Sequence, residues 1–176
     1  MVAKIPKGHP LRVLFAGLVE QVFMAELGIC DVRLTDYLGE LLADFVHMDA
    51  IYRFRTVDGE VIRDVSRAEL EAHLGPDVSG KARARIIHRH IGDFTLFWAG
   101  VYPESLSARR CGVSRLHEYL LQGRRSYGIA SELSDEHQDP PGGLLRQLSE
   151  EIECCAHGLH LVRMGWEQLN SKYHMS

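Results

Sequence analysis

Apolar residues recur at intervals of three and four along most of this chain, and this spacing is the feature that most restricts its fold. Residues three or four apart share one face of an α-helix, whereas a half-buried strand alternates every two residues. Hardly any segment alternates in this way. For the 176 residues we therefore expect an all-α, single-domain bundle over residues 1–176. It should hold about five substantial helices and one or two short ones.

Proline, glycine and capping residues set the expected helix boundaries. Pro10 suits a first helical turn and Gly28 a helix C-terminus. Ser66 and Glu69 form a capping box, and the Asp58-Gly59 turn between β-branched residues predicts a small β-hairpin near 53–63. We expect helices over about 10–28, from Asp31 or Thr35 to about 52, and over about 66–75, 79–101, 114–133 and 143–170.

Charge and cysteine content exclude several classes of protein. The chain has 20 Lys plus Arg and 24 Asp plus Glu, a net charge of −4, which makes nucleic-acid binding an unlikely role. The four cysteines form no C-x-x-C pair, so we expect reduced thiols and a cytoplasmic protein. No run approaches the roughly 20 apolar residues of a membrane span. We therefore expect none.

The first predicted helix is apolar nearly all round. Such a helix belongs at the centre of a bundle or in a subunit interface. It predicts a homodimer formed through this helix, or binding of another protein partner. The apolar residues are Leu11, Val13, Leu14, Phe15, Leu18, Val19, Val22, Phe23, Met24 and Leu27.

Four polar residues on inward-facing stripes are candidate ligands. His90 lies near the centre of the broad apolar face of the 79–101 helix, and Asp93 borders that face. Asp49 continues the buried stripe of the second helix, and Glu20 interrupts the first. Buried histidine and carboxylate groups must be hydrogen-bonded, neutral or coordinated. They could therefore hold a metal ion or small ligand, with His90 as a ligand or general base.

Two further clusters carry positive charge. Arg124 and Tyr127 continue an inward stripe, where they could bind an anionic group, and Arg124 could pair with Asp49, Asp93 or Glu20. The opposite side of the 79–101 helix predicts a basic surface stripe. It could meet phosphate or an acidic partner, or simply face water. Its members are Lys81, Arg85, His88 and Arg89.

The last predicted helix has the clearest pattern, with apolar residues alternating at steps of four and three as in a coiled-coil seam. The seam comprises Leu144, Leu148, Ile152, Cys155, Leu159, Val162, Trp166 and Leu169. The opposite face collects Glu150, Glu153, His157 and His160. We interpret that face as solvated, although its spacing could also suit a metal ion.

Three stretches resemble a group of bacterial proteins of about this length that have no assigned activity. They are His88–Trp98, Arg124–Ser131 and Leu148–Cys154. The resemblance implies an all-helical fold over most of the chain and supplies no catalytic residues.

Two functions from different classes fit these patterns. The first is an interaction or structural module with a buried polar network, since such networks can fix helix register without chemistry. The second is a bundle with an internal metal or small-ligand site centred on His90, which could be an enzyme. The sequence has no P-loop, G-x-G-x-x-G, H-E-x-x-H or G-x-S-x-G motif. We therefore favour the first.

Overall fold

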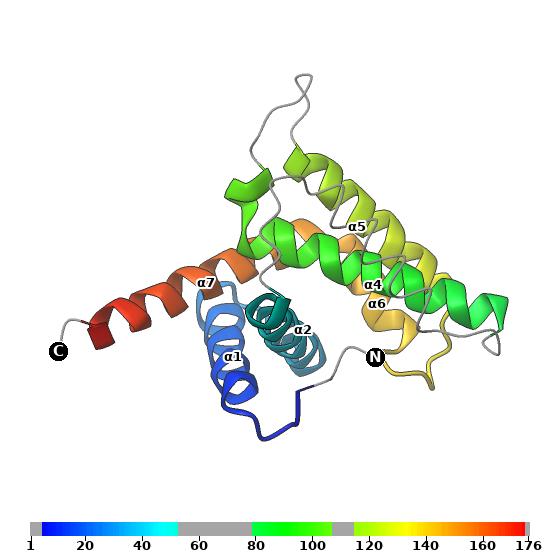
Figure 1. Ribbon diagram of the computed structural model, residues 1–176. Helices are drawn as coiled ribbons and strands as arrows, with labels where there is room; N and C mark the ends of the chain where they lie inside the picture. Colours follow the sequence, from blue (N-terminus) through cyan, green and yellow to red (C-terminus); the bar gives the residue numbers. More distant parts are fainter. Residues whose placement is uncertain (1–4, 53–78, 107–114, 175–176) are drawn as a thin grey trace. The chain divides into compact units, whose positions relative to one another are not determined.

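The computed structural model describes residues 5–52, 79–106 and 115–174, and all regular structure within them is helical (Figure 1). This confirms the all-α prediction for the described part of the chain. The predicted hairpin at 53–63 and helix at 66–75 lie outside the described residues. The elements are α1 (Pro10–Glu20), the π-helix η1 (Gln21–Glu26), α2 (Val32–Tyr52), α4 (Gly80–Val101), the 3₁₀ helix η2 (Pro103–Leu106), α5 (Arg115–Glu132), α6 (Gly142–Glu150) and α7 (Ile152–His174).

The described residues form two compact units. The α4–α6 unit contains α4, η2, α5, α6 and the start of α7 up to residue 155. The α1–α2 unit contains α1, η1, α2 and α7 from residue 156 onward. The single domain over residues 1–176 stays a prediction.

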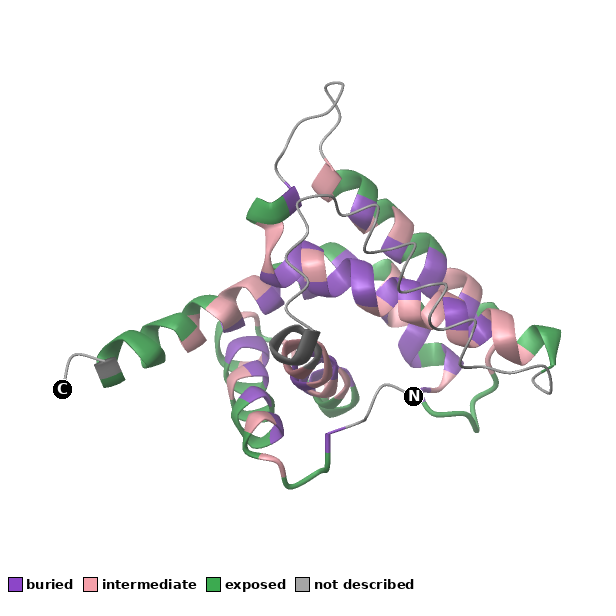
Figure 2. Cartoon of the chain, in the orientation of Figure 1, coloured by how far each residue is buried: buried purple, intermediate pink, exposed green. Residues whose placement is uncertain are grey.

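In the α4–α6 unit, α5 packs against both α4 and α6. Ser79 caps α4, its hydroxyl accepting a hydrogen bond from the amide of Ala82. The helices approach closely at glycines: a Cβ on Gly92 would meet the ring of Tyr127 at 2.7 Å. Figure 2 shows buried residues along the facing sides of these helices. The core includes Ile87, Ile91, Phe94, Phe97, Val101, Tyr127, Ala130, Leu144, Leu145, Leu148, Ile152 and Cys155.

In the α1–α2 unit, α1 and α2 pack so closely that a Cβ on Gly39 would lie 3.3 Å from the Cα of Ala16. The ring of Phe15 meets Trp166 of α7 edge-on, with centroids 5.2 Å apart. Leu159 and Val162 of α7 are buried in the same unit. The other core residues are Phe15, Val19, Val22, Phe23, Leu34, Leu38, Leu41 and Leu42.

Two helix predictions need correction. The first helix is α-helical only to Glu20 and continues as the π-helix η1, and Gly28 follows with a left-handed φ of 69°. The last helix is two helices, since Glu151 leaves the helical conformation with φ −105° and ψ 22°. The predicted seam nevertheless runs through both, and it is buried from Leu144 to Val162. Beyond that point the seam leaves the core, because Leu169 is exposed.

Among the described residues, no helix combines the length and apolar character needed to cross a membrane.

Candidate functional site

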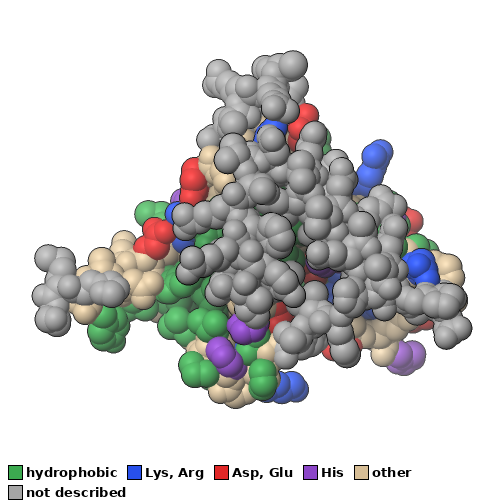
Figure 3. Space-filling view, viewed as in Figure 1, with side chains coloured by type: hydrophobic (Ala, Val, Ile, Leu, Met, Phe, Trp, Pro, Cys, Tyr) green, Lys and Arg blue, Asp and Glu red, His purple; other side chains and the backbone are tan. Residues whose placement is uncertain are grey.

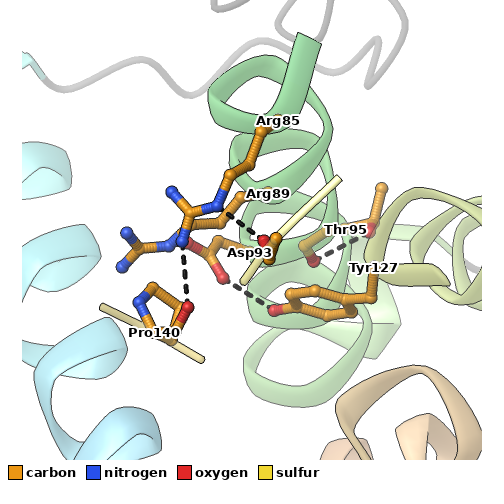
Figure 4. Close-up of polar contacts among 8 residues, drawn as sticks. Arg85, Arg89, Asp93, Thr95, Tyr127 and Pro140 are labelled. Carbon is orange, nitrogen blue, oxygen red and sulfur yellow. Dashed lines mark hydrogen bonds and ion pairs between the residues drawn. The ribbon is translucent and has the colours of Figure 1, made fainter. Parts of the chain in front are cut away.

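A chain of polar contacts links α4 to α5 (Figure 4). Tyr127 is fully buried, and its hydroxyl donates a hydrogen bond of 2.7 Å to Oδ1 of Asp93. Oδ2 of Asp93 lies 3.8 Å from Nε of Arg89, one turn earlier on α4. Thr95 is also buried, and its hydroxyl donates back to the carbonyls of Ile91 and Gly92. These contacts satisfy polar groups at the α4–α5 contact.

Arg85 lies inside this unit, which corrects its placement on a solvated stripe. Only 9% of it is exposed. Its Nε donates to the hydroxyl of Ser134 at 2.6 Å, and Nη2 donates to the carbonyl of Pro140 at 2.9 Å. The residues between α5 and α6 therefore cover this part of α4. Of the other stripe residues, Lys81 is exposed, whereas His88 and Arg89 are half-buried, so the four do not form one solvated surface.

Arg124 is also placed differently from the sequence prediction. Its guanidinium is 43% exposed and pairs with Glu153 at 2.8 Å, rather than with Asp49, Asp93 or Glu20. The start of α7 supplies this carboxylate beside α5, where the long arginine side chain can reach it from the surface. Tyr127 on the same stripe is fully buried. Arg124 and Tyr127 thus have separate partners.

The candidate ligands are divided between the two units. His90 and Asp93 are half-buried on α4, whereas Glu20 is exposed at the end of α1. Asp49 lies on α2 in the α1–α2 unit, and its side chain is outside the description. In the described residues, no three histidine, cysteine, aspartate or glutamate side chains are grouped so that they could hold a metal ion.

Arg12 is a buried charge that sequence reasoning missed. It is 9% exposed, and its two terminal nitrogens lie 3.2 Å from Oε1 of Glu40 and 3.4 Å from Oδ1 of Asp44 on α2. The signal was present in the helical spacing, because Arg12 precedes the buried Phe15 and Val19 by three and seven residues. Buried arginine is found mainly where carboxylates pair with it. The pairing therefore fixes which face of α1 turns inward.

The outward face of α1 is consequently apolar. Val13 is 65% exposed and Leu14 36%, and Pro10, Ala16 and Gly17 are exposed beside them. Glu20 is the only charged residue among the exposed positions of this fully described helix. A surface helix normally has the opposite arrangement, with its charge outside and its large aliphatic residues inside. We call Pro10, Val13, Leu14, Ala16 and Gly17 the outward α1 face.

The end of α7 adds further apolar surface to the same unit. Leu169 is 37% exposed and Tyr173 80%, and every residue from Glu167 to Tyr173 is exposed. Figure 3 shows hydrophobic side chains gathered over α1 and this part of α7. Contiguous apolar surface of this kind marks interaction sites more often than scattered single residues do.

The cysteines offer little reactive chemistry. Burial, with Cys154 and Glu151 nearby, raises the pKa of the Cys155 thiol far above its ordinary value. Since the thiolate is the nucleophilic form, Cys155 is a structural apolar residue. Cys30, Cys154 and Cys155 are free thiols.

No family model, no curated protein and no solved structure matches this chain. The functional argument therefore depends on the chain's own geometry.

Proposed function

We propose that this protein is a helical interaction module that forms a homodimer through the outward α1 face. The observation that carries the proposal is the inverted helix: Arg12 lies inside, whereas Val13 and Leu14 lie outside. Burying apolar surface against a partner is favourable by about 25 cal/mol per Å². Covering this face would remove Val13 and Leu14 from water.

The pairing of Arg12 supports this orientation of α1. Turning α1 over to bury Val13 would expose Phe15 and Val19 and separate Arg12 from Glu40 and Asp44. Removing one partner of a buried ion pair is costly, since the remaining charge is left unsatisfied. The helix is therefore held with its apolar face outward, and it is presented to a partner without rearrangement.

The lack of charge on the outward α1 face favours a second copy as the partner. In a two-fold dimer, residues near the axis face their own counterparts, so a charge there would repel itself. The outward α1 face has no charged residue from Pro10 to Gly17. A partner selected by charge would instead need charged groups on this face.

The internal polar groups support a module rather than an enzyme. Arg85, Asp93 and Tyr127 each contact neighbouring helices or loops of their own unit. Arg12 likewise joins α1 to α2. These contacts hold helices in register, as expected of a buried structural network.

Light scattering of Leu14→Glu tests the dimer. Unmodified protein should show twice the 19.9 kDa chain mass at micromolar concentration. Leu14→Glu should raise the dimer dissociation constant at least tenfold, because a buried unpaired carboxylate costs more than the ~1.4 kcal/mol of a tenfold change. Its circular dichroism should stay unchanged, since Leu14 is exposed.

Leu121→Glu is the matched control. Leu121 is an exposed leucine on α5, in the other unit. The same substitution there should leave the dissociation constant within about twofold. A chain mass of 19.9 kDa for unmodified protein at high micromolar concentration would contradict the proposal, as would equal weakening by both variants.

A further inference from the structure

We propose that, in this dimer, the end of α7 from each copy lies on the outward α1 face of the other copy. The inference rests on the proposed function and names the segment that covers the face. The occupant is residues 166–173 of a second chain, which we call the α7 arm.

The α7 arm continues the core seam of its own helix. Leu159 and Val162 are buried, Trp166 is half-buried, and Leu169 and Tyr173 are exposed. These five positions follow steps of three and four, so they share one face of α7. The seam therefore packs inside the α1–α2 unit first and then extends past it, as α7 does relative to α1 in Figure 1.

The arm cannot reach the outward α1 face of its own chain. Trp166 meets Phe15, which lies on the buried side of α1. At 100° per residue, Val13 and Gly17 each lie about 160° around the helix from Phe15. An α7 that packs on one side of α1 within a chain can therefore meet the opposite side only in another copy.

The two surfaces match in length and shape. Pro10–Gly17 and Trp166–Tyr173 are each eight residues long, or about 12 Å of helix. Gly17 has no side chain, and a Cβ placed on it would meet nothing within 4 Å. Large side chains such as Leu169 and Tyr173 can pack into the shallow surface that Ala16 and Gly17 leave.

Charge at the edges of the two surfaces is complementary. Glu20 and Glu26 are exposed next to the outward α1 face. Residues 163–173 contain Arg163, Glu167 and Lys172, two positive charges and one negative, a net charge of +1. Opposite charges at the edges of an apolar contact favour the pairing of α1 with α7 over the pairing of α1 with α1.

Disulfide trapping between two different variants tests the exchange. In full-length protein with Cys30, Cys111 and Cys154 replaced by serine, one sample carries Val13→Cys and the other carries Tyr173→Cys with a tag that changes its mass. After incubation together and mild oxidation, the mixture should form cross-linked dimers that contain one chain of each kind. Each sample alone should give less than a tenth of that yield. Leu121→Cys mixed with Tyr173→Cys is the control pair and should not cross-link.

A second measurement covers the case in which the engineered thiols fail to meet. Leu169→Glu with Tyr173→Glu should raise the dimer dissociation constant at least tenfold, with unchanged helicity because both residues are exposed. A dimer that resists this change, or that cross-links through Val13→Cys alone, overturns the exchange and leaves the proposed dimer intact. Unmodified protein that stays monomeric overturns both.

Discussion

Tyr127→Ala is expected to lower the free energy of unfolding by about 4 kcal/mol. The side chain is fully buried, with 0% exposure. Its ring lies against Gly92 so closely that a Cβ on that glycine would meet three ring carbons between 2.7 and 2.9 Å. Truncation would leave a cavity between α4 and α5, and it would remove the donor to Asp93. Urea denaturation followed by circular dichroism measures the loss.

Tyr127→Phe separates packing from hydrogen bonding at the same position. It keeps the ring and removes only the hydroxyl that donates to Asp93 at 2.7 Å. Asp93 is 16% exposed and keeps Arg89 nearby, so we expect a loss of about 1–2 kcal/mol, typical of a hydrogen bond to a charged group. If Tyr127→Phe costs as much as Tyr127→Ala, cavity formation is not the main term, and the assignment of this ring to the core packing is wrong.

Helix positions were predictable because helical spacing is a property of neighbouring residues. The apolar stripe from Leu144 to Val162 is buried as predicted, although the chain breaks at Glu151. A break of one residue barely disturbs a stripe spaced at three and four, so the pattern does not reveal it. The change to a π-helix after Glu20 is hidden for the same reason. It still presents Val22 and Phe23 to the core.

The polar residues were harder to predict, because a helical wheel shows the face of a residue and not its partner. The contact between Asp93 and Tyr127 joins residues 34 apart in sequence, and the wheel places both only near an inward face. Arg85 lies on the polar side of α4, yet the segment holding Ser134 and Pro140 folds over it. Arg12 was obscured because its neighbours on both sides are apolar.

The predicted function depended on the same distinction. An apolar first helix indicated either a bundle centre or a subunit interface, and the structure places Phe15 and Val19 inside and Val13 and Leu14 outside. Both environments thus occur on one helix. The metal alternative needed residues from several helices to converge, which spacing along one helix cannot test. Glu20 and His90 lie in different units.

Gly158→Ala is expected to cost about 2 kcal/mol, the second large effect. A Cβ at this position would lie 2.3 Å from Cζ and 2.4 Å from Cε2 of Phe23, and 3.2 Å from Cδ1 of Leu27. Phe23 belongs to η1 and is fully buried, so either its ring or α7 must move. Overpacking of this kind costs typically 1–3 kcal/mol and occasionally more, and the better helix propensity of alanine returns only about 1 kcal/mol.

Gly165→Ala on the same helix is the control, because a Cβ there would meet nothing within 4 Å. This variant should gain up to about 1 kcal/mol from helix propensity alone. The double variant Gly158→Ala with Phe23→Leu should recover part of the loss relative to Phe23→Leu alone, since the shorter side chain leaves room for the methyl group. Chemical denaturation of the four variants checks the cycle. A stabilising Gly158→Ala would show that α7 does not pack against η1 through this glycine.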